Sequence, residues 1–130
     1  RQKPIVSRRQ RQMCIRDSLL TMRWLKNLGG IKAIDEINKT KAIVMYSEID
    51  LNPLFKGFAA VEDRSTMNAT FNLTNSDLKD TFELMLKETG IEGVNGHRSV
   101  GGYRASMYNA LSLDSVKVLV EVMSELETKA

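Results

Sequence analysis

The sequence predicts an α+β fold, a two-layer sandwich in which helices cover a small antiparallel or mixed sheet. Two observations predict it: apolar residues recur at helical spacing in four segments, and three short segments have the pattern of strands. These elements follow one another in the order ααββαβα. The chain has 130 residues, of which 42% are hydrophobic, so it has room for one domain with a packed core. This length excludes a two-domain enzyme with its own internal cleft.

The first two elements are predicted to be helices. Apolar residues at helical spacing run from Leu19 to Leu28, and the pair Gly29 and Gly30 ends that segment as a helix C-cap does. A second helix is predicted over residues 31–50, with Asn52 and Pro53 stopping it. Its apolar stripe consists of Ile34, Ile37, Val44, Met45 and Ile49.

Two strands are predicted to follow. Residues 57–61 have the composition of a short buried strand, and residues 66–73 alternate with a period of two. Residues 62–65 between them are the predicted hairpin turn. One face of the second strand carries Met67, Ala69, Phe71 and Leu73, and the other carries Thr66, Asn68, Thr70 and Asn72.

The last three elements are a helix, a strand and a helix. Thr74 followed by Asp77 resembles a capping box, and it predicts a helix that ends at Gly90. Residues 103–108 alternate again as a third strand, and Ser112 caps the last helix. The predicted inward residues of the two helices are Leu78, Phe82, Met85 and Leu86, and then Leu113, Val116, Leu119, Val120, Met123 and Leu126.

The net charge of +3 belongs to the start of the chain. Of the 19 basic and 16 acidic residues, six and one lie within 1–18, which leaves 13 and 15 in 19–130. Residues 1–18 have no amphipathic period and resemble translated adapter DNA, so they are predicted to be a disordered, non-native tail before a domain over 19–130. The remaining chain is mildly acidic, which argues against binding to nucleic acid.

Composition excludes several classes of site. One cysteine, Cys14, and one histidine cannot form a disulfide framework or a four-ligand zinc site, so no metal is expected. No apolar run approaches the roughly 20 residues of a membrane-spanning helix, and no secretion signal is present. We therefore expect a cytoplasmic protein without a membrane partner.

The glycine-spaced segment over residues 93–109 is the best candidate for chemistry. Its glycines, Gly96, Gly101 and Gly102 among them, allow positive φ and close approach of the backbone to a ligand. The side chains of His97, Arg98 and Arg104 supply donors for anionic oxygens, and a guanidinium can bind a carboxylate or phosphate through two parallel hydrogen bonds. The alternative is a tight glycine turn with a solvated arginine, and spacing alone does not decide between the two.

Several motifs together resemble a known family. The stretch GHRSVGGYRASMYNA over 96–110 resembles the signature in the C-terminal domain of the phosphoserine aminotransferases. The runs WLKNLGG at 24–30, LNPLF at 51–55, AVEDRS at 60–65 and MNATF at 67–71 resemble the same family in order and spacing. The resemblance covers about 19 to 129, and residues 1–18 depart from it entirely.

The resemblance implies the small domain of a fold-type I, pyridoxal-phosphate-dependent transaminase that forms a homodimer when intact. That family converts 3-phosphohydroxypyruvate and glutamate to O-phosphoserine and 2-oxoglutarate in serine biosynthesis, and in some bacteria it also serves pyridoxine synthesis. By the same resemblance, His97 and Arg98 bind the substrate phosphate and Arg104 binds the α-carboxylate. Gly96, Gly101 and Gly102 shape the backbone of the binding loop.

The family's cofactor-binding residues lie in its large domain, whose motifs are absent from this sequence. Transamination needs a lysine that forms a Schiff base with the cofactor, and no lysine here has the family's context. We therefore expect a truncated piece with no catalytic residue, no bound pyridoxal phosphate and no activity without the missing large domain. The alternative function is a non-catalytic, anion-binding regulatory module.

Overall fold

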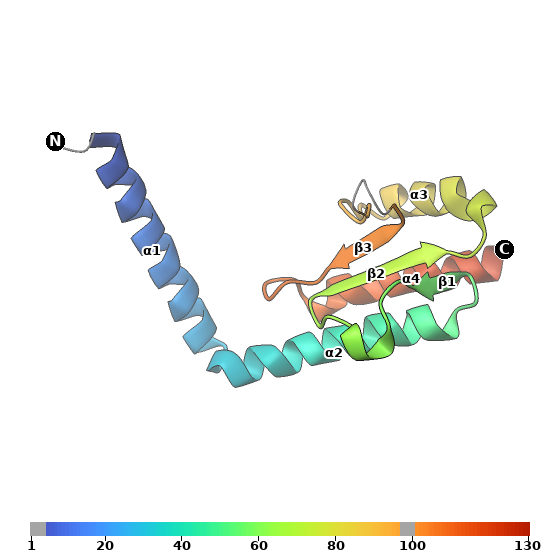
Figure 1. Cartoon of the computed structure of the whole chain (residues 1–130), viewed down its shortest axis with the longest axis horizontal. Coiled ribbons are helices and arrows are strands. Elements are labelled where there is room, and N and C mark those ends of the chain that lie inside the picture. Colours follow the sequence, from blue (N-terminus) through green and yellow to red (C-terminus); the bar gives the residue numbers. More distant parts are fainter. Residues whose placement is uncertain (1–4, 97–100) are drawn as a thin grey trace. The chain divides into compact units, whose positions relative to one another are not determined.

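The computed structural model describes residues 5–96 and 101–130, without the side chains of 5–11 (Figure 1). It divides into two compact units, residues 1–36 and 37–130. The helices and strands are α1 (Ile5–Asn27), α2 (Gly30–Leu51), β1 (Phe55–Gly57), β2 (Asn68–Leu73), α3 (Lys79–Glu88), β3 (Tyr103–Ser106) and α4 (Leu113–Lys129). None of the helices in the described ranges combines the length and apolar character needed to cross a membrane.

Helix α1 begins at Ile5, well before the predicted start at Leu19, so residues 5–18 are helical where the sequence predicted disorder. The segment contains no glycine or proline and is rich in Arg and Gln, which favour a helix through their backbone propensity alone. Its described side chains form no buried face, since every side chain from residue 12 to residue 24 is exposed. The division into a non-native tail over 1–18 and a domain over 19–130 stays a prediction.

The predicted end of α1 is confirmed. Gly29 and Gly30 have φ of 101° and 82°, a conformation that favours glycine. The amide of Leu28 still donates to the carbonyl oxygen of Trp24 at 3.1 Å, which closes the last turn.

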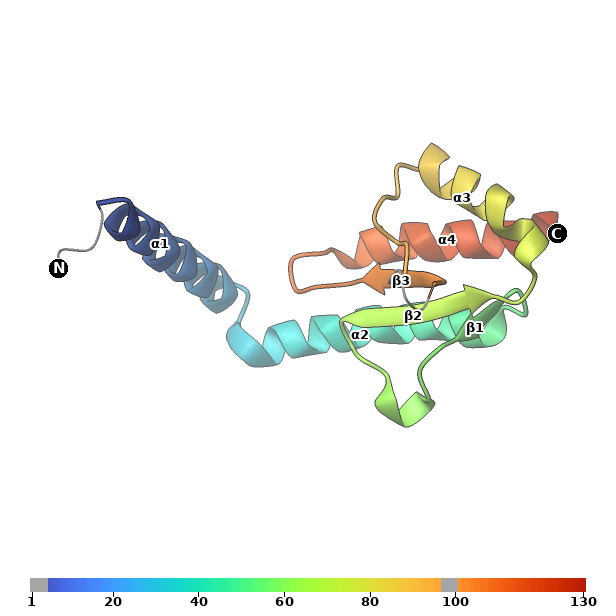
Figure 2. The ribbon, with the colours of Figure 1, turned by 45° about the horizontal axis from the view of Figure 1, so that its top comes forward.

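The sheet has three antiparallel strands in the order β1-β2-β3, so neighbours in the chain are neighbours in the sheet (Figures 1 and 2). Phe71 of β2 lies opposite Gly57 of β1 and Tyr103 of β3. Figure 2 shows α2 and α4 running along the sheet. The predicted α+β fold with an antiparallel sheet covered by helices is confirmed.

The first strand lies earlier than predicted. β1 spans Phe55–Gly57, not residues 57–61, and the chain forms a short 3-10 turn at Val61–Asp63. The apolar residues that suggested a buried strand are exposed, Phe58 by 62% and Val61 by 71%. The connection to β2 is therefore longer than the predicted hairpin turn at 62–65.

An ion pair and an aromatic ring hold this connection. The guanidinium of Arg64 donates to both carboxylate oxygens of Asp50, with each N–O distance 2.6 Å, and lies 4.6 Å from the ring centre of Tyr46. The hydroxyl of Tyr46 lies 3.2 Å from the carbonyl oxygens of Ser65 and Asn68. The Arg64 hydrogen bond holds the pKa of the Asp50 carboxyl below its usual value.

The start of α3 differs from the prediction, whereas its end and the start of α4 are as predicted. A short 3-10 helix, Ser76–Leu78, precedes α3, and the side chain of Asn75, not Thr74, caps it by accepting from the amide of Asp77 at 3.0 Å; α3 itself has no side-chain cap. Gly90 ends α3 with a φ of 72°. Ser112 caps α4, its hydroxyl oxygen accepting from the amide of Ser115 at 3.1 Å.

The core lies on one face of the sheet. Its side chains come from residues 42–49 of α2, from the three strands, from Met107 directly after β3, and from α3 and α4: Ala42, Met45, Tyr46, Ile49, Phe55, Ala69, Phe71, Phe82, Met85, Leu86, Tyr103, Ala105, Met107, Val116, Leu119, Val122, Met123 and Leu126. The alternation predicted for β2 is confirmed, since Ala69 and Phe71 are buried. The opposite face carries exposed or half-buried polar side chains, and this polar face is where Arg104 lies.

Candidate functional site

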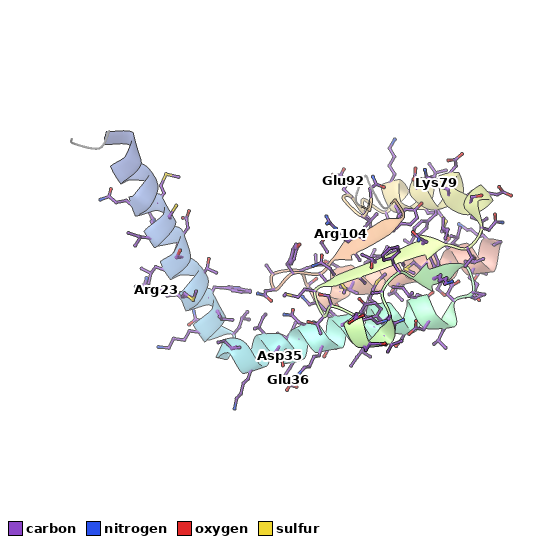
Figure 3. The ribbon with its side chains drawn as sticks, viewed as in Figure 1. Arg23, Asp35, Glu36, Lys79, Glu92 and Arg104 are labelled. Atoms are coloured by element: carbon purple, nitrogen blue, oxygen red, sulfur yellow. The ribbon has the colours of Figure 1, made fainter. Side chains whose placement is uncertain are left out.

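Arg104 is placed on the polar face by the alternation of β3. Its neighbours Tyr103 and Ala105 are buried in the core, so the side chain of Arg104 is directed to the other side and is exposed. Figure 3 shows it extending from β3. Thr70 of β2 is its partner in the antiparallel register. A strand thus holds the guanidinium at a fixed position on an accessible surface.

The described ends of the glycine-rich segment lie beside Arg104. Asn95 pairs with Tyr103, and the amide of Gly96 donates to the carbonyl oxygen of Gly102 at 2.9 Å. The amide of Arg104 donates to the carbonyl oxygen of Val94 at 2.7 Å. The two ends of the loop are therefore fixed to each other and to β3.

Three glycines are required by this geometry. Gly101 and Gly102 have φ of 73° and 68°, the positive values that the sequence predicted for these glycines and that other residues rarely adopt. A Cβ at Gly102 would collide with the side chain of Asn72, and one at Gly96 would collide with the carbonyl group of Gly101. A larger residue at Gly102 would therefore displace Asn72 of β2, and one at Gly96 would displace Gly101.

Of the predicted site residues, the structure brings together Arg104, Gly96 and Gly101. All three line a cavity of about 240 Å³, along with Phe58, Thr70, Phe71, Asn72 and Tyr103. His97 and Arg98 lie outside the described residues, so their predicted roles stay predictions.

A residue that sequence reasoning missed, Tyr103, lies under the loop. Its side chain is only 5% exposed, and its buried hydroxyl lies beside the Glu83 carboxylate without making a hydrogen bond of standard geometry. Burial, and then the negative charges of Glu83 and Asp80, raise the pKa of Tyr103 to about 12. It lines another cavity, of about 490 Å³, together with Lys79 and the predicted site residues Gly96, Gly101 and Gly102.

We expect Tyr103 to make the stability of the fold fall at high pH. The phenol binds its proton more tightly in the folded chain than in the unfolded chain, where its pKa is about 10. Its contribution is therefore complete below pH 10 and is lost as the pH rises from 10 to 12. Urea unfolding across this range is expected to show an extra loss of up to about 2 kcal/mol relative to Tyr103→Phe.

The control for this measurement is Tyr108→Phe, because Tyr108 is 56% exposed. That variant is expected to keep the full alkaline loss of the parent chain. An equal loss in the parent and in Tyr103→Phe would contradict the assignment to Tyr103.

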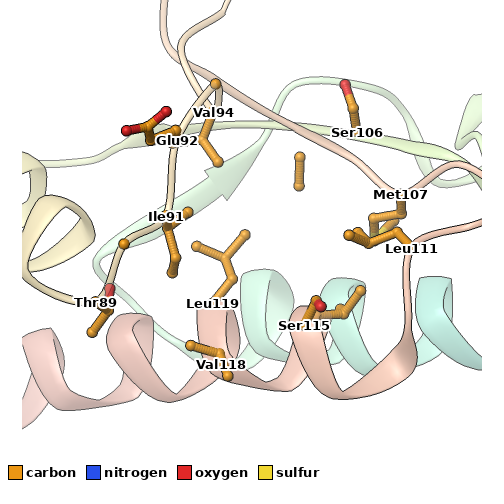
Figure 4. A pocket seen from close by; sticks show the side chains of 14 residues that line it. Thr89, Ile91, Glu92, Val94, Ser106, Met107, Leu111, Ser115, Val118 and Leu119 are labelled. Carbon is orange, nitrogen blue, oxygen red and sulfur yellow. The ribbon is translucent and has the colours of Figure 1, made fainter.

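A third cavity, of about 380 Å³, lies between residues 89–94, residues 105–111 and α4 (Figure 4). Its floor includes the buried Met107, Val116 and Leu119. Among the described residues that line it there is no lysine or arginine. It therefore lacks the donors that an anionic ligand needs, and the cavity beside Arg104 is the candidate site.

No family model matches the chain. It is 65% identical over 112 residues to the phosphoserine aminotransferase of Flavobacterium psychrophilum, and 58% identical over 112 residues to that of Flavobacterium johnsoniae. Each match covers 86% of this chain and 32% of the relative. The chain thus spans about a third of the length of the curated relatives it matches.

Solved structures give the same result. A phosphoserine aminotransferase studied for radiation damage of its Schiff base matches with 46% identity and a TM-score of 0.79, over 83% of this chain and 31% of that one. The enzyme of Bacillus circulans subsp. alkalophilus matches with 36% identity and a TM-score of 0.78, over 82% of this chain and 30% of that one. The resemblance predicted from the motifs is confirmed in sequence and in fold.

Proposed function

We propose that this chain is the substrate-binding small domain of a phosphoserine aminotransferase, the enzyme that uses pyridoxal phosphate to form O-phosphoserine and 2-oxoglutarate from 3-phosphohydroxypyruvate and glutamate. The observation that carries the proposal is Arg104, held on an accessible strand beside a glycine loop, within a chain that is 65% identical to such an enzyme. A homodimer and a cytoplasmic location for the whole protein are parts of this proposal.

In this proposal Arg104 binds the α-carboxylate that every substrate of the reaction carries. A planar guanidinium can donate two parallel hydrogen bonds to one carboxylate, which fixes the orientation of the substrate as well as its position. The pairing of β3 with β2 and with Val94 supports this role, since it leaves the backbone of Arg104 little freedom. Thr70 and Asn72 supply further polar groups in the same cavity.

His97 and Arg98 are proposed to bind the phosphate of the substrate. They belong to the loop between Gly96 and Gly101, which are lining residues of the same cavity as Arg104. Phosphoserine carries its phosphate and its carboxylate at opposite ends. Two separate groups of donors on one domain therefore suit this substrate and its 2-oxo counterpart.

The described residues do not fit pyridoxal phosphate itself. The cofactor needs a lysine that has both a lowered pKa and access to the cofactor, so that its amine can form the Schiff base. The pKa of Lys41 is lowered by burial, but its side chain is fully buried and its three N–H groups are bound to carbonyl oxygens. We propose that the remaining two thirds of the enzyme bind the cofactor and that this chain binds and orients the substrate.

The proposal is tested with two proteins. One is this chain, and the other is the joined enzyme, in which the 112 matched residues of this chain replace the corresponding part of the Flavobacterium psychrophilum relative. With pyridoxal phosphate and O-phosphoserine, we expect turnover by the joined enzyme and neither turnover nor a borohydride-trapped adduct from the chain alone. The joined enzyme with Arg104→Ala is the control that tests whether turnover of O-phosphoserine depends on Arg104.

Each outcome has a distinct meaning. A folded joined enzyme that does not convert O-phosphoserine would contradict the proposed function. A stoichiometric adduct at one lysine of the chain alone, together with turnover, would contradict its role as a substrate-binding part. Tight binding of phosphate by the chain alone, with an inactive joined enzyme, would favour the regulatory module.

A further inference from the structure

Lys41 is a buried lysine whose ammonium group donates all its hydrogen bonds to backbone carbonyl oxygens of a segment that is distant in the sequence. Its side chain is 0% exposed, although lysine is among the residues least often buried. The Nζ atom donates to the carbonyl oxygens of Met107, Tyr108 and Leu111 at 3.0, 2.9 and 3.1 Å. An ammonium group has three N–H donors, so these three bonds satisfy it completely.

The three carbonyl oxygens belong to the turn that connects β3 to α4. We call residues 107–111 the β3–α4 turn. Its first residue, Met107, follows directly after the last residue of β3, Ser106. The turn thus holds the end of β3 that lies opposite the glycine loop, with Arg104 between the two.

Other hydrogen bonds also involve this turn. The side-chain amide of Asn38 donates to Asn109 Oδ1 at 2.7 Å, and the amide of Met107 donates to the carbonyl oxygen of Met67 at 2.7 Å. Within the turn, the amide of Leu111 donates to the carbonyl oxygen of Tyr108 at 2.9 Å. The carbonyl oxygens of Met107, Tyr108 and Leu111 all lie within 3.1 Å of the same Nζ atom. Their partial negative charges are therefore close together and repel one another. The positive charge of the ammonium group attracts all three oxygens, which offsets the repulsion and stabilises this conformation of the turn.

We propose that Lys41 is a positioning residue of the substrate site: its ammonium group acts as a fixed internal cation that holds the β3–α4 turn, and through it the end of β3 that carries Arg104. Lys41 does not touch the substrate. The inference rests on the proposed function of Arg104, and it adds a second anchor for this side chain beyond the glycine loop.

The first experiment uses the 130-residue chain and does not depend on the proposed function. Lys41→Ala removes the ammonium group and leaves space for a small alkylammonium ion. Adding propylammonium chloride is expected to raise the thermal midpoint of Lys41→Ala. Tetramethylammonium has the same charge but no N–H donor, so it is expected to leave the thermal midpoint of Lys41→Ala unchanged. The thermal midpoint of the parent chain is expected to respond equally to both salts.

The second experiment measures both half-reactions of the joined enzyme. Lys41→Ala is expected to raise KM for glutamate and O-phosphoserine together and to lower kcat/KM about 10- to 100-fold for each, because a displacement of about 1 Å at a binding group can cost 100-fold. Propylammonium is expected to restore most of this loss. The control is Lys117→Ala, an exposed lysine on α4.

The outcomes separate the two proposals. An inactive joined enzyme with wild-type Lys41 contradicts the proposed function, whereas rescue of the thermal midpoint would still support the cation role. An active enzyme in which Lys41→Ala changes neither KM, or in which both salts act alike, overturns the positioning role. Should Lys41→Ala fail to fold, Lys41→Gln keeps two N–H donors without the charge, and kinetics equal to wild type would overturn the inference.

Discussion

Replacing Phe82 with alanine is expected to lower the free energy of unfolding by about 3–5 kcal/mol. Phe82 is 0% exposed and projects from α3 into the core. Its ring centre lies 5.3 Å from that of Phe55 and 5.0 Å from that of Tyr103, with interplanar angles of 62° and 82°. These are edge-to-face contacts, which stabilise aromatic pairs beyond the area that they bury.

The surroundings of Phe82 cannot close easily over the space it would leave. Phe71 contacts the same two rings, at 5.7 Å from Phe55 and 5.6 Å from Tyr103. Three of the four rings therefore come from paired strands, whose backbones are fixed by the sheet. A cavity that persists adds to the cost of the lost contacts, which is why the expected value lies at the upper end for core substitutions.

Chemical unfolding followed by circular dichroism measures this effect. Leu84→Ala is the matched control, because Leu84 lies on the same helix and is 55% exposed. It is expected to change the free energy of unfolding by less than about 1 kcal/mol. A loss for Phe82→Ala no larger than that for Leu84→Ala would contradict the packing described for α3.

The inward face of α3 was predictable because it depends on local sequence. The helical spacing of Phe82, Met85 and Leu86 matches their burial, and Gly90 ends the helix as expected. The position of β1 was not predictable in the same way. Phe55 is buried through its pairing opposite Leu73, whereas the apolar Phe58 and Val61 only resemble a strand when read without their partners.

The candidate site was likewise predictable only where it depends on a continuous stretch of sequence. The glycines and Arg104 were found from a continuous motif, and the structure brings Gly96, Gly101 and Arg104 to one cavity. The hydrogen bonds of Lys41 join residues 66 to 70 positions apart, and a lysine in a sequence is ordinarily assigned to the surface. The close approach of Asn72 to Gly102 was not predictable from the sequence either, because it depends on the register between β2 and β3.

The largest kinetic effects are expected at the two ends of the substrate. In the joined enzyme, Arg104→Lys is expected to slow the glutamate and O-phosphoserine half-reactions alike, because both substrates present an α-carboxylate and a single ammonium cannot form the paired bonds. Charged hydrogen bonds contribute roughly 1.5–3 kcal/mol each, which corresponds to about 10- to 150-fold in kcat/KM. Lys56→Ala, an exposed substitution on β1, is the control.

Arg98→Ala and His97→Ala are expected to behave differently. Each is expected to slow the O-phosphoserine half-reaction by a similar factor and to leave the glutamate half-reaction close to wild type, since only O-phosphoserine carries a phosphate. Stopped-flow measurement of both half-reactions for the three variants gives the comparison. Equal losses with both substrates in Arg98→Ala, or an Arg104→Lys variant that spares both, would show that the phosphate and carboxylate roles are assigned to the wrong residues.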